Sequence, residues 1–176
     1  MSEAEFPERA SVEGFVSELF KLVSRRATDE QWAEWLRVPL EHAAADGNID
    51  LFNALIGAGA DGSAGWRGCE GRTLFDAAAE GGNAEVVSGL VAAGAGPDVN
   101  VVSSSGRSAL YLATSLGHED AARRLVKAGA DVNSYDSITG LYVLTTALEG
   151  GCERLVNDLL DGGADIDELD RASLFL

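Results

Sequence analysis

A glycine-rich run is the first pattern in this sequence that could do chemistry. Gly57-Ala58-Gly59-Ala60-Asp61-Gly62 spells the fingerprint of a dinucleotide-binding turn, in which glycines let the backbone approach a pyrophosphate. That chemistry needs the turn to lie between a strand and a helix. Here the run follows an apolar helical segment, so we interpret it as the end of a helix and predict no cofactor.

Four carboxylates near the C-terminus are a second candidate. Asp165, Asp167, Glu168 and Asp170 offer the oxygen ligands that Ca²⁺ prefers. A calcium loop also needs Gly at its sixth position and Glu at its twelfth, and the sequence has neither. We interpret this segment as a solvated acidic end and predict no metal.

Histidines and cysteines are too few and too scattered for a catalytic pair. No nucleophile can be placed beside His42, and Cys69 is a single thiol in a Gly-rich segment. The sequence contains no nucleophile elbow, phosphate-binding loop or zinc-ligand spacing. We therefore predict that the chain is not an enzyme and has no catalytic residue.

A phrase that repeats along the chain indicates which elements the sequence builds. Gly-Ala, followed three times by Asp, begins at Gly59, Gly94, Gly129 and Gly163, in steps of 35, 35 and 34 residues. An apolar residue keeps the same spacing about 20 residues earlier, at Leu40, Phe75, Leu110 and Leu144. Self-similarity at this period is typical of stacked helical repeats.

Residues 71–95 show the expected structure of one repeat. Thr73 can cap a first helix, which Gly82 ends in a left-handed conformation. Small residues at 78–79 let neighbouring helices approach closely. The apolar residues Val86, Val87, Leu90 and Val91 predict the buried stripe of a second helix, which Gly94 ends.

This pattern resembles the ankyrin repeat, whose consensus runs Gly-x-Thr-Pro-Leu-His-x-Ala-Ala before the first turn and ends Gly-Ala-Asp-Val-Asn. The resemblance covers residues 38–170 in four copies. It implies an all-α fold, an ankyrin-repeat solenoid of stacked helix-turn-helix pairs with short hairpin-like fingers. It also places His118 and Cys152 at equivalent, structural helix-start positions. The clearest matches are Pro39-Leu40, Gly106, Gly117-His118, Gly129-Ala130-Asp131-Val132-Asn133 and Gly163-Ala164-Asp165.

The chain also departs from that consensus. Each step is longer than the family's 33 residues, and the surplus falls mostly in the fingers. Val38-Pro39, Thr73-Leu74, Ser108-Ala109 and Tyr142-Val143 stand where the consensus begins a helix with Thr-Pro. Glu41, Asp76, Tyr111 and Thr145 replace its His. These replacements predict weaker caps and weaker links between fingers, at about 0.5–2 kcal/mol per lost cap.

The two ends of the stack need covers. Apolar residues between 11 and 26 fit an amphipathic helix, and Thr28-Asp29-Glu30-Gln31 reads as a capping box before Trp32 and Trp35. We expect an N-terminal helical cap; the alternative is a partner-binding helix with exposed tryptophans. At the other end, Leu174-Phe175-Leu176 echoes the start of a repeat, which indicates either a truncated fifth repeat or a tail folded onto repeat four.

These observations predict the following organisation: a flexible N-terminus at 1–10, a helical cap at 11–37, and repeats at 38–70, 71–105, 106–140 and 141–176, the last including a C-terminal cap or truncated repeat.

Composition limits the possible partners and compartment. The chain has 29 acidic and 13 basic residues, a net charge of −16, which argues against nucleic acid and permits a basic protein. No apolar run reaches the length of a membrane span, and the distant Cys69 and Cys152 favour a reducing compartment. We expect a soluble acidic protein inside the cell, cytoplasmic or nuclear, and monomeric on its own.

In proteins that resemble this one, partners contact the finger tips and the residues before the helix-ending glycine. Aromatic and arginine side chains are the usual hot spots of an interface. Tyr142, in contrast, is expected to pack between neighbouring fingers. The predicted partner-binding residues are Trp66, Arg67, Glu70, Arg72, Glu80, Arg107, Ser115, Leu116, Tyr135, Asp136, Ile138, Leu141 and Glu149.

The leading functional hypothesis is a non-enzymatic protein–protein interaction module, a scaffold that binds a protein or peptide on its concave surface of fingers and inner helices. Two alternatives stay open: a small structural subunit of a larger assembly, and a regulatory array from a longer multidomain protein.

Overall fold

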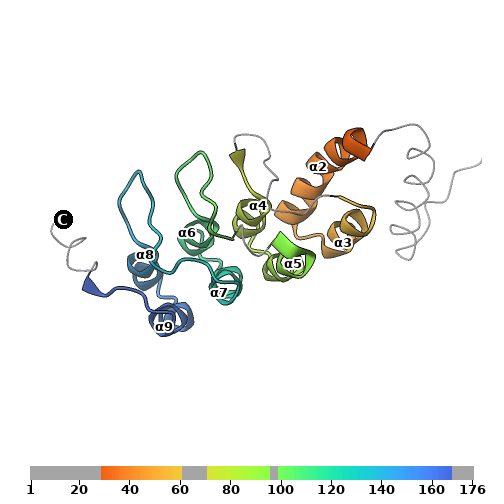
Figure 1. Cartoon of the computed structure of the whole chain (residues 1–176). Helices are drawn as coiled ribbons and strands as arrows, with labels where there is room; N and C mark the ends of the chain where they lie inside the picture. The colour runs from red at the N-terminus through yellow and green to blue at the C-terminus, as the bar shows by residue number, and fades with distance from the viewer. Residues whose placement is uncertain (1–28, 61–70, 96–98, 168–176) are drawn as a thin grey trace, which may run out of the picture.

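The fold consists of helix pairs that stack side by side along the chain. The computed structural model describes residues 29–60, 71–95 and 99–167. In Figure 1, the first helices of the pairs form one row and the second helices form another, and the fingers project from the first row. The prediction of an all-α repeat solenoid is confirmed. The pairs are α2 (Asp29–Asp46) with α3 (Ile49–Gly57), α4 (Leu74–Glu80) with α5 (Ala84–Leu90), α6 (Ala109–Ser115) with α7 (Glu119–Lys127), and α8 (Val143–Glu149) with α9 (Glu153–Asp161).

Helix α4 begins with a stronger cap than the sequence predicts. The Thr73 hydroxyl accepts a hydrogen bond from the Asp76 amide at 3.0 Å, and the Asp76 carboxylate accepts one from the Thr73 amide at 2.8 Å. This is a complete capping box, so the expectation that Asp76 weakens the cap is wrong. The helix ends as predicted, because Gly82 has a φ of +70°.

The other first helices differ in their caps. The Ser108 hydroxyl accepts a hydrogen bond from the Tyr111 amide at 3.1 Å at the start of α6. Tyr142 precedes α8 and makes no side-chain cap. The predicted loss of a cap therefore applies to α8 and not to α6.

Helix α2 runs through the point at which the sequence predicts a new helix. Its bounds are Asp29–Asp46, with Pro39 inside it, so the predicted boundary between residues 37 and 38 falls within one helix. Proline removes one helical hydrogen bond. The buried Leu36 and Leu40, which are 8% and 0% exposed, pack into the core on either side of it. Their burial offsets the lost bond.

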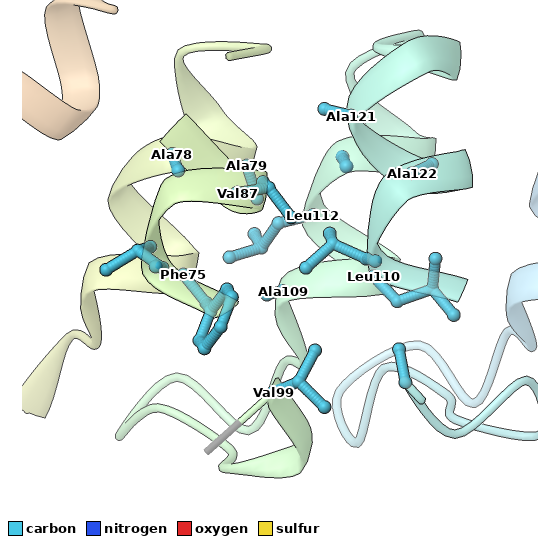
Figure 2. Packing of buried hydrophobic residues seen from close by; sticks show 14 of the residues in the cluster. Phe75, Ala78, Ala79, Val87, Val99, Ala109, Leu110, Leu112, Ala121 and Ala122 are labelled. Carbon is cyan, nitrogen blue, oxygen red and sulfur yellow. The ribbon is translucent and has the colours of Figure 1, made fainter. Parts of the chain in front are cut away.

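Small residues let the first helices stack closely. Ala77, Ala78 and Ala79 are fully buried, and an added Cβ on Gly81 would lie 2.0 Å from the carbonyl oxygen of Ala45 in α2. Larger side chains fill the space between the rows. Figure 2 shows Phe75, Leu110 and Leu112 among the alanines of α4, α6 and α7. The core is therefore one continuous layer through all the described pairs.

The apolar stripe of α5 is one residue shorter than predicted. Val86, Val87 and Leu90 are fully buried, but Val91 is 38% exposed. Val91 begins η3 (Val91–Ala95), a π-helical turn that contains Gly94 with a φ of +91°. Val91 itself is the C-cap residue of α5 and keeps helical dihedrals, with φ −61° and ψ −44°.

Asparagine side chains link successive repeats. Asn100 donates to the Gly129 carbonyl at 3.0 Å and accepts from the Asp131 amide at 2.7 Å. Asn133 repeats the pattern with Gly163 and Asp165, at 3.5 and 2.8 Å. These paired bonds fix the spacing between the repeats they join.

A second set of links joins the starts of the outer helices α5 and α7 to the preceding repeat. Asn83 donates to the carbonyls of Ala44 and Ala45, both at 3.1 Å, and a ring nitrogen of His118 lies 3.0 Å from the carbonyl oxygen of Glu80. Cys152 takes the same position before α9, where its thiol contacts the Gly150 carbonyl of its own repeat at 3.8 Å.

Candidate functional site

The finger formed by residues 134–142 is a narrow hairpin with a well-bonded turn. Its one β contact is an antiparallel bridge between Tyr135 and Tyr142. The Asp136 amide donates to the Leu141 carbonyl at 3.0 Å, and the Gly140 amide donates to the Asp136 carbonyl at 2.8 Å. These bonds give the tip a defined shape.

The tip of this finger presents aromatic and aliphatic surface. Ile138 is 72% exposed and Tyr135 is 52% exposed. The ring of Tyr135 packs on that of Tyr142, with centroids 5.4 Å apart. Tyr142 therefore packs within its own finger, and its packing against a neighbouring finger stays a prediction. The pair holds the Tyr135 ring in place while leaving half of it exposed.

Asp136 has a different environment from the one its sequence position suggested. It is 1% exposed, and its carboxylate accepts hydrogen bonds from the Ile138 amide and the Thr139 hydroxyl, each at 3.0 Å. Burial raises the pKa of this carboxyl, but those bonds and the nearby Arg107 guanidinium outweigh it and hold the pKa below its ordinary value. Asp136 therefore stabilises the turn and is not offered to a partner.

Two of the arginines that were predicted to contact a partner form ion pairs within the array. Arg107 places its Nε 3.5 Å from an Asp136 carboxylate oxygen and so joins two fingers. Arg72 forms an ion pair with Glu80 and lies 3.6 Å from Glu41 of α2. Close by, the Ser108 hydroxyl donates a hydrogen bond to the Ser134 hydroxyl at 3.0 Å, which adds to the link between the two fingers.

The inner helices present acidic residues at their C-terminal ends. Asp46, Glu80 and Glu149 are exposed at the ends of α2, α4 and α8, and none of these helices has a basic residue in its last turn. A helix C-terminus carries partial negative charge, so acidic residues there are unfavourable on their own. At the corresponding place on α6, Leu116 is 54% exposed.

The other predicted residues lie in several settings. Ser115 is exposed, but its hydroxyl donates to the Leu112 carbonyl at 3.0 Å. Leu141 is half-buried and packs against the core. Trp66, Arg67 and Glu70 lie outside the described residues.

Sequence reasoning missed the linking role of Asn100 and Asn133. Their 33-residue separation was a usable signal, because equivalent positions in a repeat face the same neighbour. It also missed Ser103, 8% exposed, whose amide donates to the Arg107 carbonyl at 3.2 Å. That bond spans the finger formed by residues 99–107.

Candidate metal ligands do not gather in the described part of the chain. No group of three or more His, Cys, Asp or Glu residues there could hold an ion. Asp165 instead accepts a hydrogen bond from the Asp167 amide at 2.9 Å, while Glu168 and Asp170 lie outside the description. His42 is exposed on α2. Across residues 29–60, 71–95 and 99–167, every helix is too short or too polar to cross a membrane.

The described residues define a class of protein: a helical repeat array that exposes apolar and acidic side chains on its fingers and at the ends of its inner helices. A family model of ankyrin repeats, three copies long, matches residues 40–136 and 96–170. The chain belongs to the ankyrin repeat family. No curated protein matches the sequence. Ankyrin repeats are generally protein–protein interaction modules, and the family is typically non-enzymatic.

Proposed function

We propose that this chain binds a protein or peptide through the surface formed by its fingers and the C-terminal ends of its inner helices. The observation that carries the proposal is the tip of the 134–142 finger. Tyr135 and Ile138 are exposed there on a turn that Asp136 already holds. A pre-ordered apolar tip loses little entropy on binding, which favours affinity.

The charge of this surface favours a basic partner. Asp46 and Glu149 add two carboxylates to helix ends that are already partly negative, and Glu80, which pairs with Arg72, adds a third. A positively charged segment would relieve this repulsion and would be steered to the surface by its field. We therefore propose a peptide that carries Lys or Arg beside an apolar anchor.

The test uses a partner captured from source lysate and then purified. Tyr135→Ala with Ile138→Ala should weaken its binding about 30-fold or more, because apolar anchors at a tip act as hot spots. The matched control is Arg124→Ala with Lys127→Ala on the outer helix α7, which should bind as the wild type does. Affinity measured by calorimetry should also fall as salt is raised.

Equal affinity of the finger variant and the wild type would place the site elsewhere. Loss of binding in the α7 variant would place it on the outer row and would contradict the proposal.

A further inference from the structure

A hollow between α4 and the 99–107 finger is lined by residues that have buried polar atoms without hydrogen bonds. Its volume is about 160 Å³, and it is lined by Arg72, Asp76, Glu80, Ser103–Ser105, Arg107 and Leu112. The hollow lies where an inner helix meets a finger, on the surface proposed above for partner binding.

Three residues that line this hollow each have one buried polar atom without a hydrogen bond: one acceptor, on Asp76, and two donors, on Arg72 and Arg107. Asp76 is 0% exposed; its Oδ2 accepts from the Thr73 amide, but its Oδ1 makes no hydrogen bond with the described residues. The Nε atoms of Arg72 and Arg107 are also buried and make none. The ends of the Arg72 guanidinium pair with Glu80 and Glu41, and Arg107 Nε forms an ion pair with Asp136 at 3.5 Å. A buried polar atom without a partner costs free energy, so these three atoms favour a ligand that satisfies them.

The charge of the lining restricts that ligand. Arg72 and Arg107 balance Asp76 and Glu80, so the hollow has no net formal charge. A cation would leave the two arginine donors unpaired, and an anion would leave the Asp76 acceptor unpaired. A carboxamide carries donor N–H groups and an oxygen with two lone pairs, so it can satisfy an acceptor and a donor at once. Leu112, 8% exposed, supplies apolar surface for an aliphatic stem.

We propose that this hollow is a subsite for the side-chain carboxamide of an Asn or Gln on the bound peptide. The carboxamide N–H donates to Asp76 Oδ1, and its oxygen accepts from the Arg72 Nε. This inference rests on the proposed function for its biological meaning, but the hollow's chemistry can be tested without a partner.

The experiment is an NMR titration of the full chain with small probes of similar size. Propionamide should shift the backbone amide signals of Asp76 and Ser103–Ser105 in a saturable manner. Propionate, n-butylammonium and 1-butanol should bind these residues at least about tenfold more weakly. Asp76→Asn keeps an oxygen for the Thr73 cap but replaces the free acceptor with a donor, and it should weaken propionamide about tenfold or more. Asp120→Asn, the same change on the exposed surface of α7, should have no effect.

Three results would overturn the subsite. They are no saturable shift with propionamide, stronger binding of any other probe, and propionamide binding that Asp76→Asn leaves intact. If Asp76→Asn does not fold, Arg72→Lys serves in its place, because it keeps the charge and removes the Nε donor. If the NMR titration fails, the test of the finger variants on partner binding still stands. If only the finger test fails, the hollow remains a carboxamide-binding site, but its role in binding a peptide is lost.

Discussion

Replacing Asp136 tests whether a buried carboxylate shapes the finger tip. Asp136→Asn has nearly the same shape as the protonated aspartic acid, so it removes the charge while keeping an oxygen for the Ile138 amide. The variant loses the charge-assisted part of the hydrogen bond from Thr139, and it loses the ion pair with Arg107. Such bonds contribute about 1.5–3 kcal/mol each in a dry interior. The finger is thin and Arg107 is 37% exposed, so water screens the pair. We expect a loss of about 1.5 kcal/mol at neutral pH.

The sign of the pH dependence follows from the lowered pKa of Asp136. The carboxylate stabilises the folded state fully above the pKa of about 3.9 that an aspartate has in the unfolded chain. That stabilisation is lost as the pH falls through the lower pKa of the folded state. The difference between wild type and variant should therefore be largest at neutral pH and shrink toward zero on acidification.

Urea denaturation followed by circular dichroism measures this difference. The unfolding midpoint should fall with an unchanged slope, which shows that stability changed and cooperativity did not. The control is Asp161→Asn, because Asp161 is exposed at the end of α9. A loss below about 0.5 kcal/mol at neutral pH, typical of an ordinary surface substitution, would refute the turn-stabilising role. So would a loss that persists unchanged in acid.

Two further predictions concern the stacking of the helices, and each has a control within the chain. Gly81→Ala should destabilise the array by about 1–3 kcal/mol, because its Cβ would meet the Ala45 carbonyl oxygen at 2.0 Å. The control is Gly57→Ala, because the added Cβ has open space around it. Thermal melts should show this variant to be as stable as the wild type or more stable by up to about 1 kcal/mol. Equal destabilisation by Gly81→Ala and Gly57→Ala would contradict the close stacking of α2 and α4. Thr73→Ala should cost about 0.5–2 kcal/mol by removing the cap of α4, whereas Thr73→Ser should recover most of it. A Ser variant as unstable as the Ala variant would show that the hydroxyl is not the source of the stability.

Much of this fold could be predicted from the sequence because a repeat imposes the same local problem several times. Gly82 ends a helix where a left-handed residue is needed, and the alanines of α4 are small because α2 and α6 pack against it. Such requirements depend on near neighbours, so the residue types reveal them. The capping hydroxyl of Thr73 was predictable for the same reason, whereas the sequence predicted a weaker cap at Ser108, which in fact caps α6.

Features set by contacts across repeats could not be predicted in this way. Asp136 looked like an exposed finger residue, but Arg107 in the preceding finger and the turn around it draw its carboxylate inward. Pro39 looked like a helix start, but the burial of Leu36 and Leu40 carries α2 through it. In both cases tertiary packing outweighs a local preference that the sequence shows clearly.

Asp76 shows how a departure from the family consensus can be misread. Its carboxylate replaces a histidine and completes a capping box, while burial raises its pKa above the ordinary value. One oxygen supports the helix, the other makes no hydrogen bond with the described residues, and the residue lines the hollow beside α4. The sequence alone could not separate these roles, because they depend on which way each oxygen points.

The most direct test of the binding surface is photo-cross-linking to the captured partner. A benzoylphenylalanine placed at Ile138, on the finger tip, should cross-link to the partner in high yield, and one placed at Lys127, on the outer row, should not. Cross-links from position 127 with none from position 138 would contradict binding through the fingers and inner helices.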